Sequence, residues 1–216
     1  AGGSVENCTI KDIRNTPLDG IQAGVGVLVN ATAGTPRTML FTGNTVTGFQ
    51  KTGTVFTGAN LTATIQGNSV TGAGPIPVTA QNGIQVSYGT QGSILENTVS
   101  GISYTGANWA ATGILLYNDT SPVNVTTARN TVSAAQVGIY YYSLGGTIEE
   151  NTVTSGAAAA GTTSYLTGIV ADPGADPRIP VQPFEIGQAP AQMADRPMST
   201  AGTMAIVATL HRNTVT

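Results

Sequence analysis

Asn97-Thr98-Val99 is one of seven closely related tripeptides in this chain of 216 residues, and their recurrence decides the fold. An apolar residue, or once a threonine, stands three positions before each copy, so the repeat is longer than the tripeptide itself. A unit that recurs every few tens of residues is typical of solenoids, in which each repeat packs on the next. The copies, called markers below, are Cys8-Thr9-Ile10, Asn44-Thr45-Val46, Asn68-Ser69-Val70, Asn97-Thr98-Val99, Asn130-Thr131-Val132, Asn151-Thr152-Val153 and Asn213-Thr214-Val215.

A second element precedes most markers and consists of a glycine followed by a β-branched alternating run. Each coil therefore contains at least two short strands. Successive markers are 36, 24, 29, 33, 21 and 62 residues apart, which indicates a minimal coil with insertions of varying length. The runs are Gly83-Ile84-Gln85-Val86, Gly113-Ile114-Leu115-Leu116, Gly138-Ile139-Tyr140-Tyr141 and Gly168-Ile169-Val170-Ala171.

Stacked coils bury what a single coil cannot, because their inward residues line up in columns. We predict one inward column from the residues three before each marker and another from the third marker residues. The marker Asn tolerates left-handed backbone angles, and its amide can bond to the next Asn, so we expect it at a bend in a buried ladder. The predicted ladder is Cys8, with a small buried side chain, and Asn44, Asn68, Asn97, Asn130, Asn151 and Asn213.

The Gly-Ile strand and the Asn-Thr-Val turn resemble the repeats of the pectate lyase-like superfamily of right-handed parallel β-helices. This resemblance covers nearly the whole chain and implies an all-β, single-stranded solenoid of about seven coils, a single domain over residues 1–216. Both of its ends are expected to be uncapped. The resemblance does not imply one activity, because that superfamily includes lyases, hydrolases, epimerases, phage tailspikes and non-catalytic surface proteins.

The segment 172–197 departs from the repeat, because six prolines within 26 residues exclude a ladder strand. We expect a Pro-rich insertion loop that lies across the outside of the solenoid. Residues 151–213 could form one coil or two. The residues before the last four markers alternate in charge: Glu96, Arg129, Glu150 and Arg212. If residues 151–213 form one coil, these side chains lie on neighbouring rungs and can form a row of ion pairs, which favours the one-coil alternative.

The composition excludes several classes of partner. The net charge is −3 and the eight Lys and Arg residues are scattered, so we expect no nucleic-acid binding. The apolar runs are too short for a membrane span. A single cysteine excludes a disulfide framework and a multi-cysteine metal site, and we predict no metal and no cofactor.

Catalytic residues are not evident. Enzymes of the pectate lyase-like superfamily use clustered carboxylates, or carboxylate-bound calcium with an Arg or Lys base, and neither pattern occurs here. The lone His211 is expected one rung from Glu149 if residues 151–213 form one coil, and we interpret it as a surface pair. Enzymatic function is disfavoured; an enzymatic chain would be a polysaccharide lyase or glycoside hydrolase.

Alternation along the Gly-Ile strands places apolar and aromatic side chains on the outer face. Tyrosine rings on a flat sheet can stack on sugar rings, and the insertion residues could reach the same side. The alternative is that a long turn or the Pro-rich segment covers this stripe as a second core. The candidate binding residues are Tyr117, Tyr140, Tyr142, Leu115, Tyr104 and Trp109.

A second outward pattern consists of the hydroxyl residues beside each marker, such as Thr98 and Ser100 or Thr131 and Ser133. These pairs predict a two-column hydroxyl array. This array resembles the ice-binding face of some antifreeze solenoids. However, threonine is also a good exposed strand residue, and the irregular coil lengths argue against matching to an ice lattice.

We therefore expect a non-catalytic extracellular or cell-surface β-solenoid, either an adhesin or a fibre subunit. Its solenoid ends would pair head to tail with another copy or with the continuation of a longer chain. The alternatives are a polysaccharide-binding module and a polysaccharide lyase or hydrolase fragment.

Overall fold

The computed structural model describes residues 1–107, 109–117, 124–143, 145–155, 166–172, 183–186 and 209–215, and its regular elements are β-strands. Within these ranges no helix has the length and apolarity needed to cross a membrane. The strands are β1 (Gly2–Glu6), β2 (Thr9–Lys11), β3 (Val25–Asn30), β4 (Arg37–Thr42), β5 (Thr45–Thr47), β6 (Thr52–Thr57), β7 (Leu61–Gln66), β8 (Ser69–Thr71), β9 (Asn82–Ser87), β10 (Gln91–Leu95), β11 (Thr98–Ile102), β12 (Thr112–Tyr117), β13 (Val125–Ala128), β14 (Thr131–Ala135), β15 (Val137–Tyr142), β16 (Thr147–Glu149), β17 (Thr152–Ser155), β18 (Thr167–Asp172), β19 (Thr209–His211) and β20 (Thr214–Val215).

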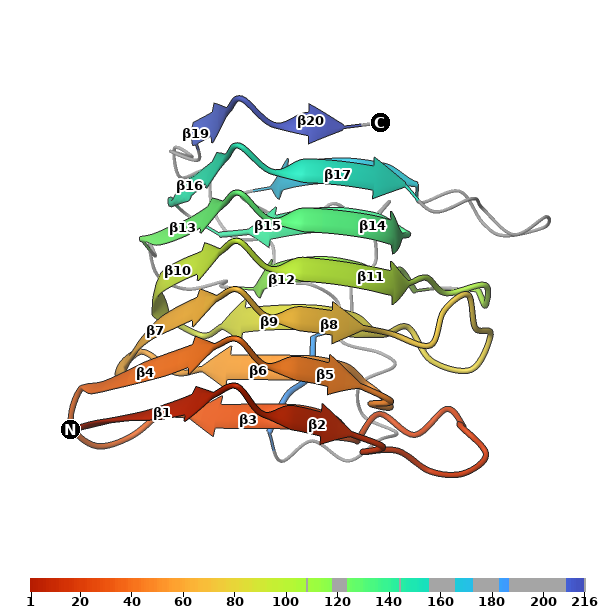
Figure 1. Cartoon of the computed structure of the whole chain (residues 1–216), viewed down its shortest axis with the longest axis horizontal. Helices are drawn as coiled ribbons and strands as arrows, with labels where there is room; N and C mark the ends of the chain where they lie inside the picture. The colour runs from red at the N-terminus through yellow and green to blue at the C-terminus, as the bar shows by residue number, and fades with distance from the viewer. Residues whose placement is uncertain are drawn as a thin grey trace.

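Three parallel sheets run along the solenoid, and neighbouring strands in each sheet come from successive coils (Figure 1). Sheet A has the order β1-β4-β7-β10-β13-β16-β19, and sheet B has the order β2-β5-β8-β11-β14-β17-β20. Sheet C has the order β18-β15-β12-β9-β6-β3. This topology confirms the predicted all-β parallel β-helix with three strands to a complete coil.

Residues 151–213 form one coil. Strand β16 pairs directly with β19, and β17 pairs directly with β20, while β18 extends sheet C from the same coil. The register places His211 opposite Glu149, as the one-coil alternative requires. The long interval between the last two markers is therefore an insertion within one coil.

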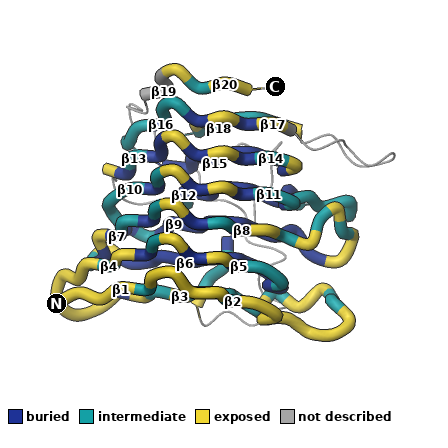
Figure 2. Tube along the Cα trace, in the orientation of Figure 1, coloured by how far each residue is buried: buried dark blue, intermediate teal, exposed yellow. Residues whose placement is uncertain are grey.

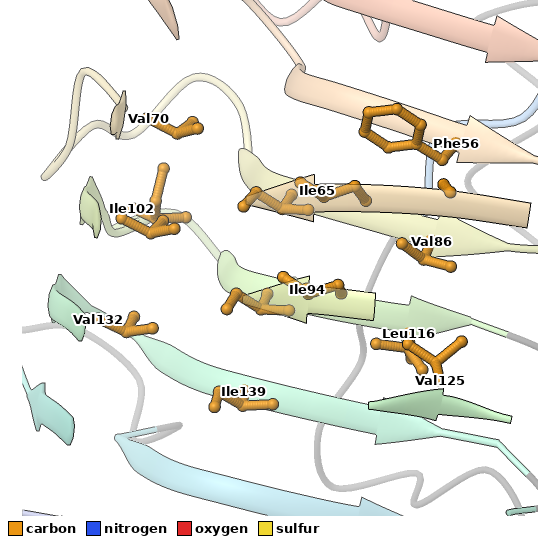
Figure 3. Close-up of a cluster of buried hydrophobic side chains, with 14 of the residues drawn as sticks. Phe56, Ile65, Val70, Val86, Ile94, Ile102, Leu116, Val125, Val132 and Ile139 are labelled. Atoms are coloured by element: carbon orange, nitrogen blue, oxygen red, sulfur yellow. The ribbon is translucent and has the colours of Figure 1, made fainter. Parts of the chain in front are cut away.

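The inward columns lie where the repeat places them. The residues three before each marker align on sheet A, and the third marker residues align on sheet B. Figure 3 shows Ile65 and Ile94 in the first column and Val70 and Val132 in the second. Full burial of one such side chain contributes roughly 1.5–3 kcal/mol. Figure 2 shows that burial is deepest in the middle coils, whereas β1 and β2 are largely exposed.

In every coil from β3 onward, the glycine of the sheet C strand lies against the valine that is the third marker residue in sheet B. A Cβ built on Gly83 would lie 2.6 Å from Val99 Cγ1 and 2.5 Å from the Gly113 carbonyl oxygen. The other glycines of this column, which share such a contact with a sheet B valine at 2.2–2.9 Å, are Gly26, Gly53, Gly113, Gly138 and Gly168. Glycine is required here because sheets B and C approach too closely for a side chain.

Candidate functional site

The marker asparagines form a continuous row of hydrogen bonds through the interior of the solenoid. From Asn44 to Asn151, each backbone N–H and each Nδ2 donates to Oδ1 of the Asn in the next coil, at 2.8–3.0 Å. Each Nδ2 also donates to a carbonyl of the sheet A column in the preceding coil, as Asn97 does to Ile65 at 3.0 Å. The amides thereby tie three successive coils together.

The left-handed backbone position at this bend is not the asparagine. It is the residue before the asparagine, with φ between 46° and 65°, which corrects our expectation for the marker Asn. The marker Asn is instead free to direct its amide along the stack. The left-handed residues are Asn7, Gly43, Gly67, Glu96, Arg129, Glu150 and Arg212.

Cys8 occupies the ladder position of the first coil but is exposed, contrary to the buried side chain we predicted. Its backbone N–H donates to Asn44 Oδ1 at 2.9 Å, as in the other rungs. Its thiol lies 3.3 Å from the Glu6 carbonyl oxygen. The exposure follows from position, because β1 and β2 are terminal strands of their sheets and no described coil covers them.

The alternating charges before the markers make surface ion pairs. Arg129 lies 3.0 Å from Glu96, and Arg212 pairs with Glu150 on the following two rungs. Hydrogen bonds from Gln66 and Arg129 hold the pKa of Glu96 below its usual value. Pairs this exposed contribute little to stability, so the row is a surface feature of the ladder bend.

The apolar and aromatic stripe points outward from sheet C, as alternation predicts, but it is not exposed. Leu115 and Tyr140 are 0% exposed and Tyr142 is 3% exposed, while Tyr117 is half-buried. With Ala110, Val137 and Val170 these residues form a second apolar cluster. The prediction of an open sugar-stacking face is therefore wrong, and the stripe is a satellite core on the outside of the sheet.

The rings of this face form a column of their own. Tyr117 stacks on Tyr142 with centroids 5.1 Å apart, and Tyr88 meets Tyr117 edge to face at 5.9 Å. The Tyr140 hydroxyl donates to Asp172 Oδ2 at 2.9 Å. The packed geometry leaves little ring area for a ligand.

Tyr104 and Trp109 do not join this stripe. Both are half-buried against the main core, and Tyr104 forms an isolated parallel bridge with Ile76. The loop after β11 therefore pairs with the loop after β8 at the sheet B end of the coil. This pairing holds Tyr104 at sheet B, away from the outer face of sheet C.

Part of the Pro-rich insertion lies on the outer face of β9. Only Asp172 and residues 183–186 of the segment 172–197 are among the described residues. Gln85 exchanges two hydrogen bonds with the backbone of Phe184, and the Tyr88 hydroxyl donates to Glu185. The sequence does not predict these contacts; the only signal is a Gln at an outward position between Ile84 and Val86.

Sheet B presents the predicted hydroxyl array without interruption in register. One column is Thr9, Thr45, Ser69, Thr98, Thr131, Thr152 and Thr214, and the other is Lys11, Thr47, Thr71, Ser100, Ser133 and Thr154. These side chains are exposed or half-buried. Long loops follow β2, β8 and β11, and the longest insertion lies between β18 and β19 (Figure 1). None of them interrupts a sheet B strand, so the irregular coil lengths leave the face regular.

Lys51 is a buried cation that the sequence did not single out. It is 0% exposed, and its Nζ donates to the Ala80 carbonyl oxygen at 2.6 Å. Burial lowers the pKa of this ammonium from 10.5 to about 7. In the part of the chain that the structure describes, no three His, Cys, Asp or Glu side chains gather at a place that could hold a metal ion.

Comparison with known proteins gives one match. A family model described as the right-handed β-helix region matches residues 1–170. No curated protein and no solved structure matches the chain.

Proposed function

This chain belongs to the right-handed β-helix family, and we propose that it is a non-catalytic structural or adhesive element of an extracellular surface. The single observation that carries the proposal is the hydroxyl face of sheet B. Among the described residues, one column has seven rungs in continuous register and the other has six, and Lys11 is the only charged residue in them.

A face of this kind suits broad contact with an uncharged, hydroxyl-rich surface such as a neutral polysaccharide coat. Each hydroxyl offers both a donor and an acceptor. A single such bond contributes only about 0.5–1.5 kcal/mol because it replaces a bond to water. Adhesion would therefore come from many equivalent rungs acting together, which is what the repetition supplies.

The described carboxylates support the non-catalytic part of the proposal because several already have structural partners. Glu96 bonds Gln66 and Arg129, and Glu150 pairs with Arg212. Asp172 accepts from Tyr140, and Glu185 accepts from Tyr88. Glu96 and Glu150 thus lie in surface ion pairs at the ladder bend, whereas Asp172 and Glu185 bond tyrosines of sheet C and the turn after β9.

Charge substitution tests the proposal. We expect Thr98→Lys combined with Thr131→Lys, on adjacent rungs of sheet B, to reduce retention of protein-coated beads on neutral polysaccharide films under flow. The matched control is Thr38→Lys combined with Thr62→Lys, which changes exposed threonines on adjacent rungs of sheet A. Equal loss in both pairs, or retention unchanged in the sheet B pair, would contradict adhesion through this face.

A further inference from the structure

The insertion segment 183–186 is bound to sheet C much as a peptide ligand is bound to a receptor. Gln85 Nε2 donates to the Phe184 carbonyl oxygen at 2.9 Å, and the Phe184 N–H donates to Gln85 Oε1 at 2.7 Å. The side-chain amide thus pairs with both backbone groups of one residue. Figure 1 shows this short blue segment on the far side of the coils, behind β9.

A second contact binds a side chain of the segment. The Tyr88 hydroxyl donates to Glu185 Oε1 at 2.6 Å, next to the backbone pairing. Pro183 is buried, and it has no N–H that burial would leave unsatisfied. Backbone pairing provides affinity for an extended peptide, and the carboxylate and the proline provide selectivity.

Gln85 is built for an occupant on this face. Its side chain is 0% exposed although it points away from the core; Phe184 pairs with both Nε2 and Oε1, and Nε2 also donates to Ser87 Oγ at 3.2 Å. Without an occupant, an outward glutamine would stand in an apolar run beside the buried Leu115 on the next rung.

We propose that the outer face of β9 is a docking site for an extended Pro-Phe-Glu segment, and that residues 183–186 of a second copy can occupy it in place of the chain's own segment. Exchange keeps every contact identical, which is why swapping of one element between copies costs little. Residues 173–182 and 187–208 connect the segment to β18 and β19, and an extended chain can span roughly 3.3 Å per residue.

Docking within one chain has a strong advantage at ordinary concentrations. A tethered segment has an effective concentration on the order of 1 mM, so a second copy competes only when the intrachain contact is broken. The exchange is therefore revealed by two variants that each lack one half of the contact.

The test mixes two complementary variants. Phe184→Pro removes the N–H that Gln85 accepts, which leaves an intact receptor without a competent segment. Gln85→Leu removes the receptor amide and leaves an intact segment. With donor and acceptor fluorophores on the two chains, we expect energy transfer in the mixture that exceeds transfer within either variant alone. Mixing Phe184→Pro with Gln66→Leu, which changes a Gln outside the contact, should give no excess.

A second pair of variants with smaller changes keeps the test valid if Phe184→Pro or Gln85→Leu fails to fold. Tyr88→Phe weakens only the receptor and Glu185→Gln weakens only the segment, so their mixture also restores one intact contact between chains. A labelled peptide with the sequence of residues 182–187 should likewise bind Phe184→Pro, and bind at least tenfold more weakly when its own Phe is replaced by Pro. Absence of excess transfer in both mixtures, with no peptide binding, would overturn the proposal.

Discussion

At the scale of single residues, the ladder asparagines couple one coil to the next. Asn97 accepts from the backbone N–H and the Nδ2 of Asn68, and its own Nδ2 donates to Asn130. All of these groups are buried, so they cannot turn to water if one partner is removed. The cost of a ladder substitution therefore spreads over two neighbouring rungs.

We expect Asn97→Ala to lower the free energy of unfolding by roughly 2–5 kcal/mol, because it leaves buried donors on Asn68 without an acceptor. Chemical denaturation followed by circular dichroism measures this change. Asn124→Ala, at an exposed position, should change stability by less than about 0.5 kcal/mol. A similar small effect at Asn97 would show that the ladder contributes no net stability.

Lys51 makes stability depend on pH. Its pKa is about 7 in the folded chain and 10.5 when exposed, so between these values the unfolded chain holds a proton that the folded chain lacks. Raising the pH across this window therefore increases the free energy of unfolding. Relative to Lys51→Met, the wild-type chain should gain up to about 1.4 kcal/mol per pH unit.

Denaturant titrations at pH 7.5, 8.5 and 9.5 measure this gain. The Lys11→Met variant, at an exposed position, serves as the control for the loss of a lysine side chain. If the stability of the wild type relative to Lys51→Met does not rise with pH, a proton-linked penalty at Lys51 is contradicted.

At the scale of elements, the contact between the glycine column of sheet C and the valine column of sheet B sets how closely the sheets approach. Gly83→Ala would place a Cβ against both Val99 and the Gly113 carbonyl oxygen. Overpacking of this kind costs roughly 1–3 kcal/mol or more.

We expect Gly83→Ala to lower the melting temperature, and Gly3→Ala, which has open space around the added Cβ, to leave it nearly unchanged. Val99→Ala in the Gly83→Ala background should recover only part of the loss, because the backbone carbonyl still clashes. Complete recovery in the double variant would show that the valine alone requires the glycine.

Sequence periodicity located the strands beside each marker because inward residues repeat within every coil. The left-handed position was missed although Gly43 and Gly67 occupy it, because Glu96 and Arg129 fill the same position on later rungs and conceal the pattern. A Pro-rich loop on the outside of the solenoid was predicted, but its contact with β9 could not be located, because Gln85 and Phe184 are 99 positions apart. A pattern of neighbours carries no information about such a long-range contact.

At the scale of the whole molecule, β1, β2 and β3 are the terminal strands of their sheets in the described part of the chain. Their outer edges carry backbone groups that can pair with a further coil. Inward residues of this coil, including Ile10 and Val29, are only half-buried. Head-to-tail addition of a second copy at this edge, or pairing with the continuation of a longer chain, stays a prediction.

Light scattering tests this association. We expect the average mass to rise with concentration, and Ile10→Lys to suppress the rise because it puts a charge on the contact face. Leu28→Lys, at a position 45% exposed on the outside of sheet C, should have no such effect. A constant monomer mass at all concentrations would contradict head-to-tail growth. Gln85→Leu should also leave the rise in average mass unaffected. This result would distinguish head-to-tail association from segment exchange.

The ladder also bears on how such a gene can change length. Each rung offers its neighbours the same amide contacts, whatever loops the coil carries. Unequal crossing-over between two marker codons would add or delete a complete turn, and the new junction would find its partners already in place. A chain with one turn more or fewer would therefore keep the amide contacts on both sides of the new junction.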